Sequence, residues 1–227
     1  MTDYTWTGAV NTSWKVAGNW DVGSNYPGQG GVDDKALIDT GSADIQFDDD
    51  AGDPKIGEIE ITSGFSGTVT QMGVVCNVAI DAGAENGKLT IGGGTWDTNG
   101  AALTVTGACT VGTAGTLNLN GSTVSLGTIN VGNGASASMT FSSATTTITL
   151  DPNSTHPTWG FSLGAAATVN FNGGTIKFAK VDSGTRYMQM GAEGTHVLND
   201  VIVDTNYDIP WAGFFEAASL DIQDGNL

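Results

Sequence analysis

Leu89-Thr90-Ile91, Leu103-Thr104-Val105, Leu117-Asn118-Leu119, Val124-Ser125-Leu126, Ile129-Asn130-Val131, Met139-Thr140-Phe141 and Ile148-Thr149-Leu150 are versions of one apolar-polar-apolar phrase that recurs through residues 89–150. Side chains alternate in direction along an extended strand, so the outer two residues of each phrase point to one side and the polar residue points to the other. Glycine-rich segments separate the phrases at 92–94, 112–115 and 132–134. Glycine readily adopts the left-handed backbone angles of a sharp bend. The pattern predicts a β-solenoid, with short strands coiling around one narrow core.

The composition also indicates an all-β protein. The 227 residues include 34 glycines and five prolines, and no helical periodicity is apparent. We assign one face of the coil to residues 78–80, 103–105, 124–126, 148–150 and 169–171, which recur at a spacing suited to a three-sided coil. A β-sandwich is the alternative fold, because its strands can follow one another at a similar spacing.

The charge of the chain excludes some partners. It carries 24 acidic and seven basic residues, a formal net charge of −17. Proteins that bind nucleic acids need the opposite sign to neutralise phosphates, so we expect no nucleic-acid partner. No run approaches the ~20 apolar residues of a membrane helix, so we expect no membrane span. Cys76 and Cys109 lie in apolar phrases far apart in the sequence, which predicts buried free thiols.

Residues 1–45 differ from the repeat. They contain Trp6-Thr7-Gly8, Trp14, Asn19-Trp20, Pro27 and Asp34-Lys35-Ala36-Leu37-Ile38, the pattern W-x-G, W, N-W, P, D-x-A-x-I. This pattern resembles the opening segment of bacterial autotransporter passenger domains and adhesin-like proteins, and the repeat is also similar to β-helical phage spikes and decoration proteins. The resemblance implies a right-handed parallel β-helix. We therefore divide the chain into a capping or attachment segment, 1–45, and a solenoid, 46–227, which could continue beyond 227.

Trp6, Trp14 and Trp20 have two interpretations. The first coil of a solenoid exposes an apolar cross-section and unpaired strand edges, which an atypical end unit must cover. Three tryptophans supply the large apolar area of such a cap. Their rings could instead form a stacking platform for carbohydrate. The sequence favours the cap.

An acidic stretch raises the question of a metal. Between residues 33 and 60 the chain has ten acidic residues and two lysines. Asp48, Asp49, Asp50 and Asp53 surround a glycine turn with the hard oxygen ligands that Ca²⁺ prefers, but they lack the spacing of an EF-hand. Calcium is the one cofactor that the sequence suggests, and a solvated acidic loop is the alternative.

Candidate catalytic residues are few. β-Helical lyases use acidic clusters with a basic residue, and hydrolases of this fold use paired carboxylates. The single arginine, Arg186, could meet Asp182 across a turn, as any surface ion pair can. His156 and His196 lie in loop-like sequence without an evident partner. We therefore expect a protein that is not an enzyme.

The uncharged segment 98–150 points to self-association. It contains no Asp, Glu, Lys or Arg, whereas solvated surfaces are normally well supplied with charge. Charged residues are depleted at the centres of interfaces. The segment predicts a homo-oligomer, most simply a trimer, with Thr104, Asn118 and Asn130 pointing outward at or near the contacts.

These observations favour a structural protein. The start Met1-Thr2-Asp3 shows no secretory signal, which fits a bacteriophage particle protein assembled in the cytoplasm: a capsid decoration, spike or fibre component located in the virion. Its partners would be other copies of itself, other particle or surface proteins, and glycans. The alternatives are a bacterial surface or secreted adhesin passenger and a polysaccharide-binding or polysaccharide-degrading β-helix.

Overall fold

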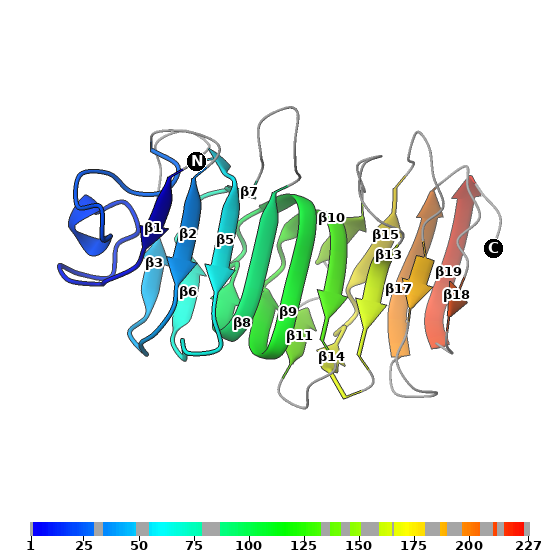
Figure 1. Cartoon of the computed structure of the whole chain (residues 1–227). Helices are drawn as coiled ribbons and strands as arrows, with labels where there is room; N and C mark the ends of the chain where they lie inside the picture. Colours follow the sequence, from blue (N-terminus) through cyan, green and yellow to red (C-terminus); the bar gives the residue numbers. More distant parts are fainter. Residues whose placement is uncertain are drawn as a thin grey trace.

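The computed structural model describes residues 2–29, 34–48, 55–78, 87–132, 137–141, 146–150, 159–164, 166–179, 187–189, 197–204, 211–212 and 216–224. These residues form one sheet of 19 strands that coils along a single axis, with the N-terminus at one end and the C-terminus at the other (Figure 1). Within these ranges the only helical segment is one 3-10 turn, η1 (Ala17–Asn19).

Three long strands turn corners of the coil. They are β8 (Lys88–Asp97), β9 (Leu103–Leu119) and β10 (Thr123–Val131), and different parts of each pair with different neighbours. The pairings sort all the strands into three faces that run along the solenoid. Below, face A, face B and face C denote these three sides.

Each face is a ladder of parallel strands, one per coil. Face A contains β1 (Asp3–Thr5), β2 (Lys35–Ile38), β5 (Glu58–Ile61), 88–91 of β8, 109–111 of β9, 129–131 of β10, β13 (Trp159–Leu163), β16 (Tyr187–Gln189) and β18 (Trp211–Ala212). Face B contains β3 (Ile45–Phe47), β6 (Thr68–Gln71), 95–97 of β8, 116–119 of β9, β11 (Ser138–Phe141) and β14 (Thr168–Asn170). Face C contains β4 (Lys55–Ile56), β7 (Cys76–Val78), 103–105 of β9, 123–126 of β10, β12 (Thr147–Leu150), β15 (Thr175–Phe178), β17 (Val197–Asp204) and β19 (Glu216–Asp224).

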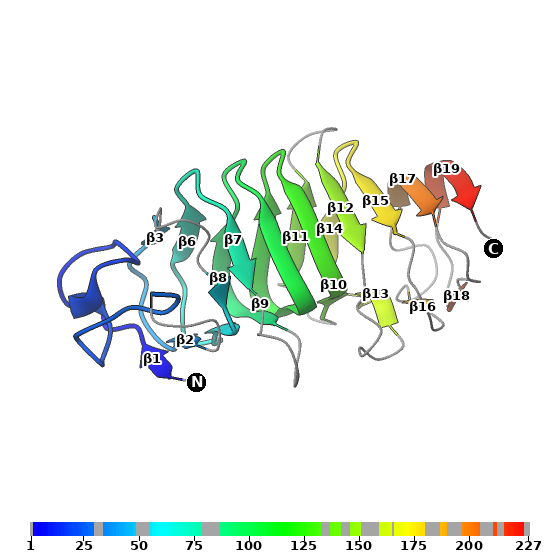
Figure 2. The ribbon, with the colours of Figure 1, turned by 90° about the horizontal axis from the view of Figure 1, so that it is seen from above.

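The coil is a right-handed parallel β-solenoid, as the sequence predicted. Strands on the near side of Figure 1, such as β2 and β5, point downward while the chain advances from left to right. Figure 2 looks down on the solenoid, and there β12 and β15 run toward the side that faces the viewer in Figure 1. A chain that comes forward at the top, goes down at the front and advances to the right forms a right-handed coil. Every strand-to-strand ladder among the described residues is parallel, which excludes the antiparallel sandwich as the fold of these residues.

The core is built from the outer residues of the repeated phrases. In all seven phrases between residues 89 and 150, both apolar side chains are buried and the middle side chain is at least partly exposed. Burial of each such aliphatic side chain stabilises the fold by about 1.5–3 kcal/mol. A single apolar column therefore fills the solenoid from end to end of this region, and Cys76 and Cys109 are part of it as free, buried thiols, as predicted.

The register was predicted correctly in the middle of face C and wrongly at both of its ends. Strand segments 103–105, 124–126 and 148–150 stack as expected. However, Val78 pairs with Val105 rather than Leu103, because the strand is 76–78. A shift by two residues leaves the same side chains facing inward, so the alternation could not reveal it.

The second register error concerns Val169. Ile148 pairs with Ile176 of β15, whereas Val169 belongs to face B, where it pairs with Met139. The coil that follows β12 is longer than the coil before it, so a constant repeat length selects the wrong phrase.

The glycines at the corners serve close packing more than left-handed angles. In the described parts of the three glycine-rich segments, only Gly94 has a positive φ, +59°. At Gly115, by contrast, a Cβ atom would collide with the carbonyl group of Ile91 one coil earlier. Adjacent coils thus approach so closely at this corner that no side chain fits between them.

Candidate functional surfaces

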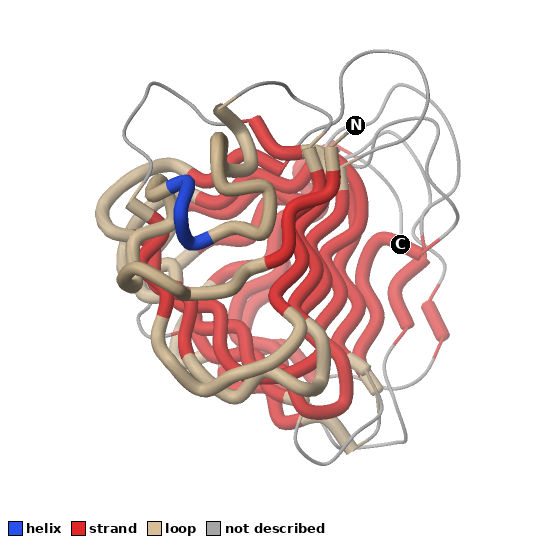
Figure 3. The backbone as a smooth tube through the Cα atoms, turned by 60° about the vertical axis from the view of Figure 1, so that its left-hand side comes forward, coloured by secondary structure: helices blue, strands red, loops and turns tan. Residues whose placement is uncertain are grey.

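The N-terminal end of the solenoid is closed by the tryptophan segment. Figure 3 shows η1 and its flanking loops lying across the end of the stacked strands. Trp14 and Trp20 are almost fully buried and contact each other edge to face, with ring centroids 4.7 Å apart. Trp14 also packs on Phe47 of the first face B strand, at 4.9 Å. These two rings cannot serve as an exposed platform for sugars, and they form the predicted cap.

Hydrogen bonds close the strand edges beneath this cap. Gln46 of β3 donates its N–H to the Thr12 carbonyl (2.7 Å) and accepts from the Trp14 N–H (2.8 Å). On face A, the Thr5 N–H of β1 donates to Asp21 Oδ1 (2.8 Å), and the Thr5 carbonyl accepts from the Asp21 N–H (3.0 Å). Edge groups that would otherwise pair with another chain are therefore satisfied internally.

The N-W pair of the sequence pattern has a clear structural role. Asn19 is buried, and its Oδ1 accepts from the Val10 N–H (2.9 Å) and the Asn11 N–H (3.0 Å). Its Nδ2 donates to Asn11 Oδ1 and to the Ser13 carbonyl, each at 2.8 Å. The neighbouring Trp20 donates from Nε1 to the Trp14 carbonyl (2.8 Å). Asn19 thus organises the loop, and Trp20 covers the core.

The predicted calcium ligands are only partly within the described residues. Asp48 lies at the end of β3, where its Oδ2 accepts from Ser13 Oγ (2.7 Å) and its Oδ1 accepts from the Lys15 N–H (3.3 Å). This carboxylate fastens the cap to the first coil. Asp49, Asp50 and Asp53 lie outside the described residues, and the calcium site stays a prediction. Among the residues that the structure describes, no group of three or more His, Cys, Asp or Glu side chains is placed to hold a metal ion.

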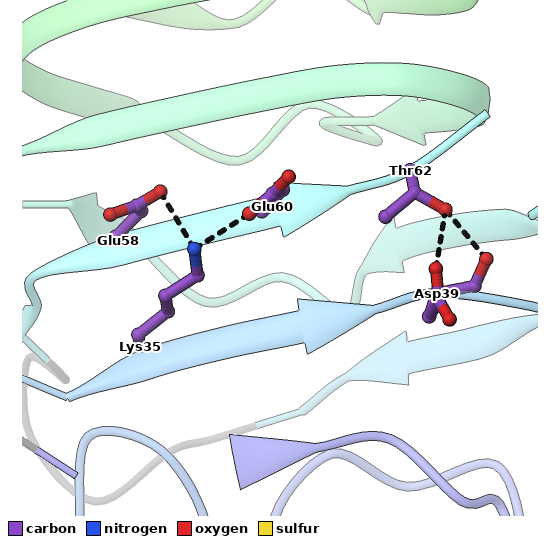
Figure 4. A network of polar contacts seen from close by, with 5 residues as sticks. All are labelled: Lys35, Asp39, Glu58, Glu60 and Thr62. Carbon is purple, nitrogen blue, oxygen red and sulfur yellow. Dashed lines mark hydrogen bonds and ion pairs between the residues drawn. The ribbon is translucent and has the colours of Figure 1, made fainter. Parts of the chain in front are cut away.

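Charged side chains on face A form a group of ion pairs (Figure 4). Lys35 Nζ lies 2.6 Å from Glu60 Oε2 and 3.2 Å from Glu58 Oε1. The hydrogen bond with Glu60 is the largest of the effects that raise the pKa of Lys35. Such partly exposed pairs contribute little to stability, at most about 1 kcal/mol each. Because both carboxylates share one lysine, they form a surface ion-pair group rather than an acid and a base facing an open groove.

Thr62 and Asp39 extend this network toward the corner. The Thr62 hydroxyl lies 2.6 Å from the Asp39 carbonyl oxygen and 3.0 Å from Asp39 Oδ1, and it donates to these acceptors (Figure 4). Asp39 and Thr62 directly follow β2 and β5, which pair in register. The contact therefore joins two successive coils where they leave face A.

The residues that the sequence offered for catalysis, His156, Asp182, Arg186 and His196, all lie outside the described residues. No helix in the described part of the chain is long and apolar enough to cross a membrane.

A buried polar group that the sequence analysis missed lies between faces B and C. Gln71 is fully buried and accepts from Trp96 Nε1 at its Oε1 (3.0 Å). Its Nε2 donates to the carbonyls of Val74 (3.1 Å) and Ala102 (3.0 Å). The only sequence signal is its position two residues after Val69, on the inward side of β6.

A second buried polar group follows the same corner along the next coils. The Thr98 hydroxyl donates to the Asn118 carbonyl (3.1 Å) and accepts from the Asn120 N–H (3.1 Å). From the coil on the other side of this turn, the Thr146 hydroxyl donates to the Leu119 carbonyl (2.9 Å) and accepts from the Gly121 N–H (3.0 Å). Both side chains are completely buried. These threonines replace the backbone pairing that the sharp turn interrupts.

The two buried cysteines give a prediction for reactivity. Burial raises the pKa of the Cys109 thiol to about 12, and it raises the pKa of Cys76 as well. Because the thiolate is the reacting species, we expect both cysteines of the folded protein to react with a thiol reagent at pH 8 at least about a thousand-fold more slowly than after unfolding. Colorimetric thiol titration with and without guanidinium chloride measures this ratio. Rapid native labelling of either cysteine would contradict its burial.

No protein-family model, curated protein or solved structure matches the chain. The part of the resemblance to autotransporter passengers that the structure supports is the β-solenoid fold.

Proposed function

We propose that the chain is a non-enzymatic structural protein of a bacteriophage particle, a capsid decoration, spike or fibre component of the virion. The observation that carries this proposal is the closed end of the solenoid: the chain covers its own first coil with Trp14 and Trp20 and satisfies the edges of β1 and β3. A solenoid whose first coil is covered in this way suits a component that projects from an assembly.

The arrangement of polar groups supports the same proposal. The buried polar side chains of Gln71, Thr98 and Asn19 hold loops and coils together through hydrogen bonds. Lys35 does the same through its ion pairs. The outward side chains of the middle coils are small and neutral, which suits contact with protein neighbours. Its partners in this role are other copies of the chain, forming a homo-oligomer with a trimer as the simplest form, and other particle proteins. Glycans on the host surface are a further class of partner.

Purified particles test this proposal directly. Mass spectrometry of density-gradient-purified virions from the encoding phage or induced prophage should recover the chain at a fixed copy number relative to the major capsid protein. Antibody labelling in electron microscopy should place it on the particle surface. Recovery from the bacterial cell surface or the culture medium, with none in particles, would overturn the proposal in favour of the adhesin. Cleavage of a polysaccharide by the purified chain would favour the second alternative.

A further inference from the structure

The uncharged segment 98–150 does not form one surface. It passes around the coil and contributes Thr104 to face C, Asn118 to face B and Asn130 to face A. All three side chains point outward, as predicted. The question of where copies could meet must therefore be asked for each face separately.

Face B has the fewest charged side chains of the three faces. In-register pairing arranges its outward side chains in two columns: Thr68, Thr95, Thr116, Ser138 and Thr168 form one, and Gln46, Thr70, Asp97, Asn118, Thr140 and Asn170 form the other. The neutral columns extend beyond segment 98–150 at both ends. The one charged residue among these eleven is Asp97, whose Oδ1 accepts hydrogen bonds from the Asn99 N–H (2.7 Å) and from Asn120 Nδ2. Asp44, directly before β3, adds a charge at the N-terminal end of the face, where its Oδ1 accepts from the Thr68 N–H (2.9 Å).

The other two faces carry more charge. Face A begins with the register column Asp3, Lys35, Glu58 and Lys88. Near its C-terminal end, face C carries Lys177, whose Nζ lies 2.8 Å from Asp204 Oδ2. The same end also carries Asp200 and Asp221, on the outward side of β17 and β19. Two chains that each carry a net charge of −17 repel each other unless they meet where charge is sparse.

We infer that face B is the contact surface with a second copy of this chain, turned toward the axis of the homo-oligomer; this inference rests on the self-association in the proposed function. Strands of one sheet repeat every ~4.8 Å, so two copies with parallel axes present hydroxyl and amide groups at matching heights. Thr116 and Ser138 already show such a pair within one copy, with their hydroxyl oxygens 2.9 Å apart. Neutral groups that hydrogen-bond across an interface can be buried at a modest cost, whereas a lone charge cannot.

An apolar rim adjoins face B. Met72 and Val75 lie in the turn between β6 and β7 and are 45% and 43% exposed, among the most exposed large apolar side chains of the described residues. Six strands of three or four residues give face B an area of only about 300–400 Å². A standard interface needs about 800 Å² per partner, so the corner turns must contribute and we expect association in the micromolar range.

Three matched variants locate the contact. Asn118→Asp places one negative charge on face B, Thr104→Asp places it on face C, and Asn130→Asp places it on face A. Each position is the outward-pointing middle residue of an apolar-polar-apolar phrase. In sedimentation-velocity runs from about 1 to about 200 μM, we expect Asn118→Asp to raise the dissociation constant at least tenfold and the other two to change it less than threefold. A larger effect of Thr104→Asp or Asn130→Asp would overturn the assignment to face B.

Two further measurements distinguish burial of face B from a general effect of net charge and from misfolding of a variant. Asn118→Lys lowers the net negative charge, so it should also weaken association if the face is buried, and it should strengthen association if only long-range repulsion matters. Far-UV circular dichroism and a thermal melt show whether each variant is folded. A wild-type chain that stays monomeric at about 200 μM would contradict the face B inference, while the presence of the chain in purified virions would still support the particle role.

Discussion

Replacing Trp14 with alanine should lower the free energy of unfolding by about 3–5 kcal/mol, the usual cost of truncating a fully buried large aromatic side chain. Trp14 is completely buried, touches Trp20 and Phe47, and donates from Nε1 to the Pro27 carbonyl (3.2 Å). Its loss would open a cavity above the first coil and loosen the loop that covers the edge of β3. Guanidinium chloride unfolding followed by far-UV circular dichroism measures the change.

Trp6 offers the matched control for this variant. It is only partly buried and packs against Trp20 from the outside, with ring centroids 5.1 Å apart. Trp6→Ala should therefore cost less than half as much as Trp14→Ala. In a solenoid each coil depends mainly on its neighbours, so hydrogen exchange in Trp14→Ala should rise first in β2 and β3. Equal destabilisation by the two variants would contradict the cap as we describe it.

Replacing Gln71 with methionine should destabilise the protein by about 3–5 kcal/mol, although the two side chains are similar in size. The variant removes the acceptor of Trp96 Nε1 and the donor to the carbonyls of Val74 and Ala102, all at a completely buried position. Each buried polar group left without a partner costs about 1–3 kcal/mol. The midpoint and slope of denaturant unfolding give the value.

Gln46 is the internal control, since it lies on the neighbouring strand of the same face but points outward. Gln46 pairs in register with Thr70, and its side chain is exposed, whereas Gln71 pairs with Phe47 on the inward side. Gln46→Met should change stability by less than about 0.5 kcal/mol. A small effect of Gln71→Met would mean that its hydrogen bonds are dispensable and that the corner is held by packing alone.

The sequence predicted those features that depend on neighbouring residues. Alternation with period two identified the inward and outward side chains of all seven phrases, because the direction of a side chain in a strand depends only on local geometry. The large apolar area of Trp14 and Trp20 likewise identified the cap.

Features that depend on coil length could not be predicted in the same way. The stacking of Ile176 on Ile148, and of Val105 on Val78, depends on how many residues each corner holds. The role of Gln71 was hidden because a glutamine at an inward position is stable only when partners meet it, here Trp96 and the carbonyls of Val74 and Ala102. Face B was hidden for a related reason: segment 98–150 is continuous in sequence, but its side chains are divided among three faces.

The most direct test of self-association through face B is a distance measurement between copies. Because Cys76 and Cys109 are buried, single cysteines introduced by Thr140→Cys, Thr149→Cys and Asn130→Cys can be spin-labelled one at a time, on faces B, C and A respectively. Double electron–electron resonance on the oligomer should give the shortest distance between copies for the label at position 140. A shorter distance for the label at 149 or 130, or no dipolar signal from any of the three at a concentration where the chain associates, would contradict the account.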